Sequence, residues 1–171
     1  AGDVNGDGYS DVIVSAPLND AVGSNAGRAY IYFGGSTMNN TADVILSGAA
    51  ANDQFGTSVS SAGDFNSDGF SDVIAGCQTE SYNRQIGAYV FLGSASGINE
   101  LPAWTASVPA GTNYEGFYWS VSGAGDINND GYEDIIVGTF SGYALIYKGS
   151  ANRGMYEPAD NVLSQPEPWF G

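Results

Sequence analysis

Residues 1–15 read A-G-D-V-N-G-D-G-Y-S-D-V-I-V-S, and this pattern returns twice further along the chain. The later copies read A-G-D-F-N-S-D-G-F-S-D-V-I-A-G at 62–76 and A-G-D-I-N-N-D-G-Y-E-D-I-I-V-G at 124–138. All three align without a gap, and their first aspartates lie 61 and 62 residues apart, at Asp3, Asp64 and Asp126. A regular period of this length is typical of proteins that stack one supersecondary unit several times.

Two further blocks recur in the same order. Each acidic segment is followed by a strand-like block that ends in glycine, A-Y-I-Y-F-G at 29–34, A-Y-V-F-L-G at 88–93 and A-L-I-Y-K-G at 144–149. The second and third copies are preceded by F-G-T-S-V-S-S at 55–61 and F-Y-W-S-V-S-G at 117–123. We therefore expect a single segment, 1–171, that consists of three repeats at approximately 1–54, 55–116 and 117–171.

Each repeat has the residue pattern of β-strands. A short β-branched run follows the acidic segment, as in V-I-V at 12–14, which is typical of a buried strand. In 29–33 and 88–92 small or aliphatic side chains alternate with aromatic ones, so both faces of these strands are expected to be covered. No stretch has helical periodicity with caps at both ends. These features predict an all-β fold of β-propeller blades, each with about four antiparallel strands.

The acidic segments share the nine-residue pattern D-x-N-x-D-G-[YF]-x-D, at 3–11, 64–72 and 126–134. Side-chain oxygens at positions one, three, five and nine, with the main-chain carbonyl of position seven, face one centre on a tight loop. Ca²⁺ takes hard oxygen ligands of this kind, whereas Mg²⁺ prefers fewer protein ligands in a stricter octahedron. We predict three Ca²⁺ sites, whose ligands are Asp3, Asn5, Asp7, Tyr9, Asp11, Asp64, Asn66, Asp68, Phe70, Asp72, Asp126, Asn128, Asp130, Tyr132 and Asp134.

Two alternatives to these sites follow from the same residues. An EF-hand is disfavoured, because its position twelve requires Glu and the chain has Val14, Ala75 and Val137 there. A metal-free turn is the second alternative, since Asp, Asn and Gly all favour turns. Three copies at a fixed spacing, each with an aspartate at position nine, favour the metal, because three carboxylates on one small loop repel each other unless a cation offsets them.

The composition excludes several classes of protein. The chain carries 19 acidic and 4 basic residues, a net charge of −15, and no histidine. A Ser-His-Asp triad and a histidine-liganded zinc site are therefore ruled out. One cysteine, Cys77, forms no internal disulfide. Four scattered cations make nucleic acid a poor partner, and no apolar run reaches the length of a membrane span. The acidic residues outside the three loops show no paired spacing, so we expect no enzyme activity.

The three repeats resemble the FG-GAP repeat of the integrin α-subunit β-propeller family. Phe55-Gly56 matches the first half of the name and Ser15-Ala16-Pro17 is close to the second, whereas the third copy has Phe117-Tyr118 instead. The resemblance covers nearly the whole chain, and the acidic loop is its most specific part. It implies blades around a central axis, with Ca²⁺ in the loop between the first two strands of each blade. Such propellers usually have seven blades.

The resemblance implies an extracellular or cell-surface protein with a structural or adhesion role. Ca²⁺ would make the inter-strand loops rigid, and a protein or glycan ligand is expected. The alternatives are an accessory carbohydrate- or lipid-binding module of a secreted hydrolase, and a subunit of an extracellular filament. Three blades are too few to close a propeller. The chain is therefore expected to be a fragment of a longer array, or to assemble with further copies that supply neighbouring blades.

Some residues outside the repeat pattern are candidate ligand contacts. Aromatic residues that do not recur are better candidates than those that do, although packing between blades is the alternative for them. The irregular loop after Cys77 is a weaker candidate surface, Cys77 itself is expected to be inert packing, and Asn39 fits the N-glycosylation pattern. The aromatic candidates are Trp104, Tyr114, Phe117, Tyr118, Trp119 and Trp169, and the loop candidates are Glu80, Tyr82 and Arg84.

Overall fold

The computed structural model describes residues 1–78, 86–107, 120–139, 142–152 and 158–164, and all regular elements among them are β-strands. No helix in these ranges has the length and apolarity needed to cross a bilayer. The all-β prediction is thereby confirmed. The strands are β1 (Val12–Ala16), β2 (Arg28–Tyr32), β3 (Val44–Ser47), β4 (Phe55–Gly63), β5 (Asp72–Cys77), β6 (Ile86–Phe91), β7 (Trp104–Ser107), β8 (Ser120–Gly125), β9 (Asp134–Gly138), β10 (Tyr143–Tyr147) and β11 (Asn161–Ser164).

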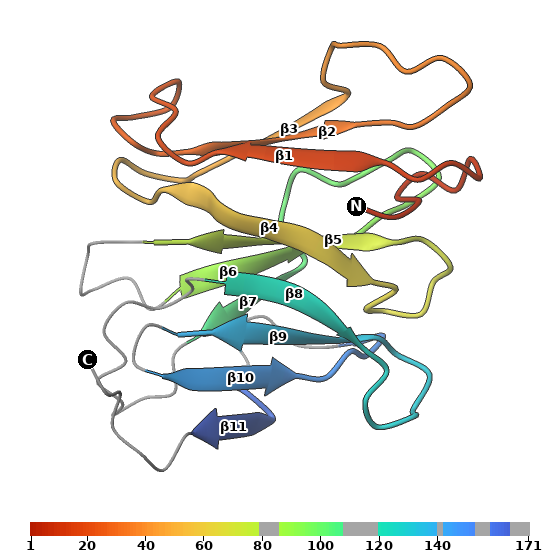
Figure 1. Ribbon diagram of the computed structural model, residues 1–171, viewed down its shortest axis with the longest axis vertical. Coiled ribbons are helices and arrows are strands. Elements are labelled where there is room, and N and C mark those ends of the chain that lie inside the picture. The colour runs from red at the N-terminus through yellow and green to blue at the C-terminus, as the bar shows by residue number, and fades with distance from the viewer. Residues whose placement is uncertain (79–85, 108–119, 140–141, 153–157, 165–171) are drawn as a thin grey trace.

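The strands form three antiparallel sheets, stacked one on another (Figure 1). The second sheet has the order β4-β5-β6-β7 and the third β8-β9-β10-β11, so that consecutive strands pair throughout. The first sheet, β1-β2-β3, has three strands. A single bridge between Gly2 and Asp11 stands where Gly63 pairs with Asp72 in the second sheet. The predicted blades of about four antiparallel strands are therefore present, and in the first sheet this bridge stands in place of the innermost strand.

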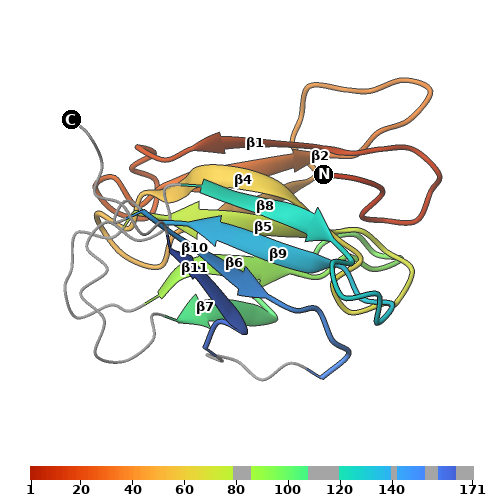
Figure 2. The same ribbon diagram turned by 60° about the horizontal axis from the view of Figure 1, so that its bottom comes forward.

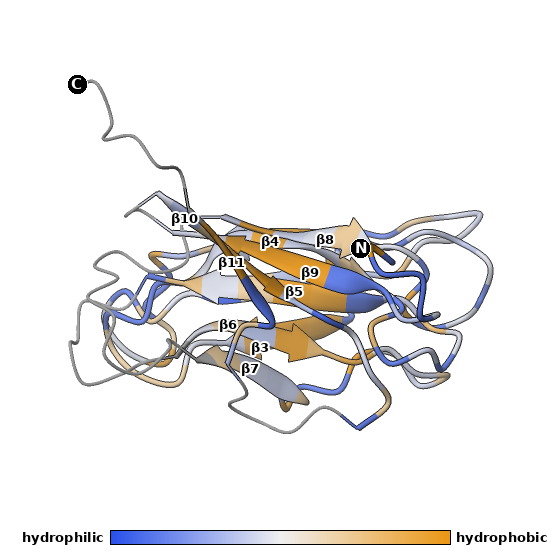
Figure 3. Ribbon diagram, turned by 90° about the horizontal axis from the view of Figure 1, so that it is seen from below, coloured by the Kyte–Doolittle hydropathy of each residue, from blue (hydrophilic) through white to orange (hydrophobic). Residues whose placement is uncertain are grey.

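Two apolar cores separate the sheets, and the middle sheet contributes to both. Ala88 and Val90 of β6 face the third sheet, in a core with Ile135 and Leu145. Phe91, on the opposite face of the same strand, belongs to the core against the first sheet. The alternation predicted for 88–92 is thus confirmed, and it is the direct result of the two-residue period of a strand. Figure 2 shows the layered arrangement, and in Figure 3 β5 and β9 are largely orange, with blue at the ends beside the loops.

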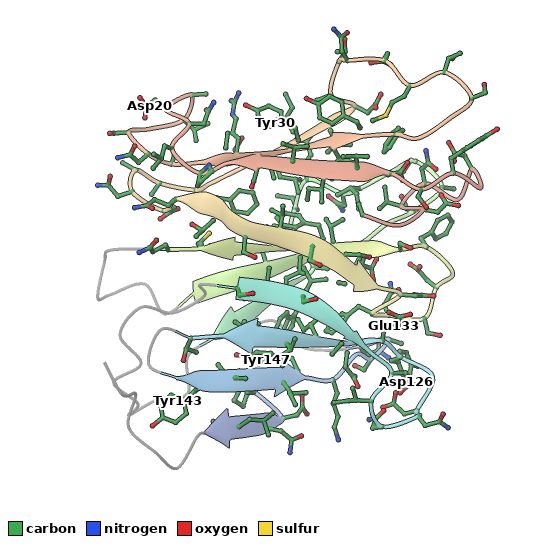
Figure 4. All side chains as sticks on the ribbon, viewed as in Figure 1. Asp20, Tyr30, Asp126, Glu133, Tyr143 and Tyr147 are labelled. Carbon is green, nitrogen blue, oxygen red and sulfur yellow. The ribbon has the colours of Figure 1, made fainter. Side chains whose placement is uncertain are left out.

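The outer face of the first sheet differs from the prediction that both faces are covered. Val12, Val14 and Ile45 lie on this face and are 41%, 50% and 41% exposed. Tyr30, which pairs with Val14, points to the same side, away from the second sheet (Figure 4). The sequence pattern of the strand is that of a two-sided interior, but no sheet lies against this side among the described residues. The result is an apolar face open to solvent.

Trp104 is part of the interior, so its interpretation as a ligand contact is wrong. Its side chain is 1% exposed, and its ring lies 4.8 Å from that of Tyr147 and 5.8 Å from that of Phe65. Packing between sheets, the alternative, holds for this residue. Cys77 ends β5 and is buried in the other core, in agreement with its expected packing role.

Candidate metal centres

The three acidic loops lie side by side along one edge of the stack of sheets (Figure 1). We call them loop 1 (3–11), loop 2 (64–72) and loop 3 (126–134), and we number the positions of each from one to nine. Loop 2 joins β4 to β5, loop 3 joins β8 to β9, and loop 1 leads into β1. Because position nine falls at or beside the first residue of the following strand, each loop occupies the same place in its own sheet.

The chain of loop 1 winds around the carboxylate of Asp3 at position one. Its Oδ1 accepts hydrogen bonds from the N–H groups of Gly6 at 2.7 Å and Asp7 at 3.1 Å. Its Oδ2 accepts one from the N–H of Gly8 at 2.9 Å. Short acidic side chains favour turns because they bond the backbone a few residues further on. Position one therefore organises the loop from its centre.

The same hydrogen bonds recur in the other loops. The N–H groups of Gly69 and Gly131 each donate to the position-one carboxylate at 2.8 Å. In every loop the asparagine Oδ1 at position three accepts the N–H of position five, at 3.0, 3.2 and 3.2 Å. The aspartate at position five in turn accepts the N–H of position seven, at 2.9, 3.0 and 3.1 Å. Three sequences that differ at several positions thus adopt one loop conformation.

Two positions in each loop have the left-handed backbone conformation. At position six, Gly8, Gly69 and Gly131 have φ values of 88°, 92° and 91°, which glycine adopts without steric cost. Position four is also left-handed, with φ of 58° at Ser67 and 60° at Asn129. This second position was not predicted, because only loop 1 has a glycine there. Asn visits this conformation readily, whereas Ser does so at a cost.

The aspartate at position nine is buried and bonds two separate segments. In loop 2 the Oδ2 of Asp72 accepts the N–H of Phe65 at 2.9 Å, and its Oδ1 accepts the N–H of Gly93 at 2.8 Å. Asp11 and Asp134 make the equivalent bonds in their own sheets. Gly93 follows β6, so position nine connects the start of its loop with the end of the third strand. This structural role was not predicted. The recurring glycine at the end of each strand-like block is the feature of the sequence that accompanies it, because its N–H donates to position nine.

Burial and charge act in opposite directions on these carboxylates. Burial raises the pKa of Asp72 to about 7, the hydrogen bonds from Gly93 and Phe65 oppose that rise, and the nearby negative charges of Asp68 and Asp64 add to it. By contrast, the pKa of Asp126 is lowered, first of all by the hydrogen bond from Gly131. A cation beside a buried carboxylate favours its charged form, so loop 2 has an electrostatic reason to take one up.

The donor set of each loop suits a hard cation, although the carboxylates are not gathered around one point. Among the described residues, no three acidic or cysteine side chains are arranged to hold a metal ion together. The carboxylate oxygens accept main-chain N–H groups, and each position-nine carboxylate accepts two. An ionised carboxylate has about four lone-pair sites, so the three N–H bonds to Asp3, the two each to Asp64 and Asp126, and the two at each position nine leave capacity for a metal. Three carboxylates, one amide oxygen and one carbonyl per loop match the ligands of Ca²⁺.

Most of the other candidate ligand contacts lie outside the described residues. Asn39 is exposed, and its Oδ1 accepts the N–H of Thr41 at 2.7 Å. The remaining candidates that fall outside the described ranges are Glu80, Tyr82, Arg84, Tyr114, Phe117, Tyr118, Trp119 and Trp169.

Comparison with known proteins gives matches over the acidic loops and the strands after them. The FG-GAP repeat matches residues 1–32, and the FG-GAP-like repeat matches residues 64–137. The chain is an FG-GAP repeat protein. Each FG-GAP match contains at least one complete acidic loop and the β-strand that follows it.

Integrin α subunits are among the relatives of this FG-GAP chain. Integrin alpha-5 of Xenopus laevis is 31% identical over 157 residues, which are 87% of this chain and 15% of that protein. Integrin alpha-IIb of Mus musculus is 33% identical over 145 residues, 81% of this chain and 14% of that protein. Integrin alpha-6 of Gallus gallus is 30% identical over 167 residues, 96% of this chain and 15% of that protein. The FG-GAP chain thus spans about one seventh of the length of these relatives.

Proposed function

We propose that the chain is an extracellular, calcium-stabilised run of β-propeller blades with a structural or adhesion role and no catalytic activity. The observation that carries the proposal is the threefold recurrence of one loop conformation around one oxygen donor set, at the same place in three sheets. The integrin α relatives support a role in adhesion. An extracellular setting agrees with the weak Ca²⁺ affinity of extracellular modules, about 10⁻⁴ to 10⁻³ M.

Calcium would act on stability by offsetting charge and by fixing loop ends. The aspartates at positions one, five and nine of the three loops are nine of the 19 acidic residues, so they carry much of the net charge of −15. Three Ca²⁺ ions would return six positive charges. In loops 2 and 3 the ion would also tie the end of one strand to the start of the next, because the ligands run from position one to position nine. Metal binding of this kind adds to the free energy of unfolding.

Thermal unfolding tests the proposal. We expect the Tm in 10 mM CaCl₂ to exceed that in EDTA by at least about 5 °C, since ligand at ten to a hundred times Kd adds about 1.4–2.7 kcal/mol per site. The same concentration of MgCl₂ controls for ionic strength and should give a smaller rise. Equal midpoints in CaCl₂ and EDTA would contradict the calcium role.

A matched variant assigns the effect to the loops. Asp7, Asp68 and Asp130 occupy position five, are exposed, and make only hydrogen bonds within their own loop. Replacing all three by Ala removes one carboxylate from each site and leaves the buried position-nine carboxylates in place. The variant should unfold at nearly the same temperature in CaCl₂ and in EDTA. A calcium response of wild-type size in this variant would place the metal elsewhere.

The two end faces of the stack are proposed to contact further blades, either of a longer parent chain or of other copies. Val12 and Val14 on the open face of the first sheet are the repeat equivalents of Val73 and Ala75, which are buried against that sheet. A face that is interior in one repeat and exposed in the next indicates a missing neighbour. Light scattering with size-exclusion chromatography tests association of the 171-residue chain. A chain that stays monomeric at all concentrations would exclude association between copies.

A further inference from the structure

The main chains of adjacent acidic loops are hydrogen-bonded to each other. The N–H of Ser71, at position eight of loop 2, donates to the carbonyl of Asp3, at position one of loop 1, over 2.9 Å. The same bond joins Glu133 of loop 3 to Asp64 of loop 2, over 3.2 Å. Both bonds run between equivalent positions. In loops 1 and 2, the residue at position one therefore organises its own loop through its carboxylate. Its main-chain carbonyl contacts the next loop.

Side chains of each later loop also cover the loop before it. The ring of Phe70, at position seven of loop 2, lies so close to Gly6 of loop 1 that a Cβ at Gly6 would stand 2.7 Å from its Cε1 atom. The glycine that precedes each loop has the same relation to position eight of the following one. Gly2 lies against the side chain of Ser71, and Gly63 lies against the side chain of Glu133. In Figure 4, Glu133 is seen between loops 2 and 3.

The exposure of equivalent residues follows from this one-directional cover. Asp3 and Asn5 of loop 1 are half-buried, as are Asp64 and Asn66 of loop 2, whereas Asp126 and Asn128 of loop 3 are exposed. At position seven the trend in exposure is reversed, and the most exposed residue belongs to loop 1. Tyr9 of loop 1 is 49% exposed, whereas Phe70 and Tyr132 are half-buried. Within the described ranges, loop 1 is covered by loop 2, loop 2 by loop 3, and no loop covers loop 3.

We propose that cation binding is coupled between adjacent loops, so that an ion in one loop raises the affinity of its neighbour. This inference rests on the calcium role proposed above. Ordering of loop 1 around an ion fixes Asp3, whose carbonyl accepts the N–H of Ser71. Ser71 lies between two ligand positions of loop 2, the carbonyl of Phe70 and the carboxylate of Asp72. An ion that orders one loop therefore reduces the conformational entropy that the neighbouring loop must lose when it binds its own ion. By thermodynamic linkage, the effect is the same in both directions.

The contacts predict which pairs of loops are coupled. Loop 2 stands between the other two (Figure 1), and it makes the described main-chain bonds to both. Removing the ion from loop 2 should weaken loop 1 by about three- to thirtyfold in Kd, the range that a coupling through packed contacts gives. Removing it from loop 3 should weaken loop 1 much less. A general loss of stability would instead weaken every remaining loop alike.

Calcium titrations of the ¹⁵N-labelled 171-residue chain, followed by two-dimensional NMR, test the proposal. The amide protons of Gly8, Gly69 and Gly131 each bond a position-one carboxylate and so report on their own loop. The Kd of loop 1, read at Gly8, is compared in the wild type, in Asp68→Ala and in Asp130→Ala. If Asp68→Ala does not fold, Asp68→Asn replaces it, since an amide oxygen still accepts the N–H of Phe70.

Phe70→Ala and its matched control Tyr9→Ala locate the coupling. Both remove an aromatic side chain at position seven and keep the carbonyl, but only Phe70 contacts a preceding loop. Phe70→Ala should reduce the factor by which Asp68→Ala weakens loop 1, and Tyr9→Ala should leave that factor in place.

Two results would overturn the proposal while leaving the calcium role standing. One is an unchanged loop 1 affinity in Asp68→Ala, and the other is an equal loss in Asp68→Ala and Asp130→Ala. If Ca²⁺ shifts none of the three glycine amides in the wild type, the calcium role fails, and the coupling fails with it.

Discussion

The side chain of Glu133, in the third acidic loop, lies against the α-carbon of Gly63, the last residue of β4 in the neighbouring sheet. Gly63 has a φ of 68°, and a Cβ there would overlap the Glu133 carboxyl group. Gly125, its equivalent at the end of β8, has a φ of 71°, and a Cβ there would meet nothing within 4 Å. The two glycines therefore share a backbone conformation and differ in whether a following loop covers them.

Replacing these glycines by alanine separates the two effects. Gly125→Ala should lower the free energy of unfolding by about 1–2 kcal/mol, the cost of placing an L-residue in the left-handed region. Gly63→Ala should cost more, because the Glu133 side chain must also move. Urea denaturation of both variants measures the difference, and adding Glu133→Ala to Gly63→Ala should bring its loss down to that of Gly125→Ala. Equal losses in the two single variants would contradict the contact between the loops.

The two kinds of loop aspartate should respond differently when calcium is absent. Asp72→Ala leaves the buried N–H groups of Phe65 and Gly93 without their acceptor, so it should destabilise the chain by about 2–4 kcal/mol in EDTA. Asp68 is exposed, and Asp68→Ala should cost under about 1 kcal/mol in EDTA and show its main effect in CaCl₂. Urea unfolding in both buffers gives all four values. If Asp72→Ala proved harmless in EDTA, position nine would have no structural role apart from a metal.

Position two of the loops tests the cover of one sheet by the next. Val4 and Phe65 are 0% and 2% exposed in the two cores, whereas Ile127 is 51% exposed. Phe65→Ala should lower the free energy of unfolding by about 3–5 kcal/mol. Ile127→Ala should cost under about 1 kcal/mol in this chain. If a longer parent protein has a blade after the third sheet, Ile127→Ala should cost as much there as a core substitution. A small loss of stability in the parent protein would mean that no blade covers Ile127.

The left-handed residues at position four offer a stabilising change. Ser67→Gly should raise the free energy of unfolding by up to about 1 kcal/mol, because glycine adopts a φ of 58° without steric cost. Asn129→Gly should gain less, since Asn already tolerates this conformation. Thermal melts in EDTA compare the two variants without a metal contribution. A loss of stability in Ser67→Gly would show that its side chain contributes more than its backbone costs.

The repeat pattern made much of this structure predictable. Alternation in 88–92 gave the two-sided middle sheet, and the short β-branched runs gave the strands that follow each loop. The glycine at position six gave the turn itself. These features are local, and three copies of each made them visible in one sequence. The FG-GAP resemblance rested chiefly on the acidic loops, with Phe55-Gly56 and Ser15-Ala16-Pro17 beside them.

Contacts between repeats were not predictable in the same way. Ser71 and Glu133 occupy equivalent positions with unrelated side chains, because what they share is a main-chain N–H that any residue except proline supplies. Trp104 was predicted to be a ligand contact because it does not recur in the other repeats. It is buried because the third sheet packs against it, and this contact between repeats has no sign in the sequence pattern. The outer face of the first sheet was predicted to be covered, but Val12, Val14 and Ile45 are exposed there. A strand pattern indicates that a face needs a partner without saying where the partner comes from.

The order in which the loops cover one another gives the stack a direction. Each sheet presents one kind of face to the sheet before it and a different kind to the sheet after it, so the open faces at the two ends are unlike. If copies of this unit associate through these two faces, the contact is heterologous, head to tail, and does not have a twofold axis. Repetition of that contact either closes into a ring or continues as a fibre, and the rotation between neighbouring sheets decides which.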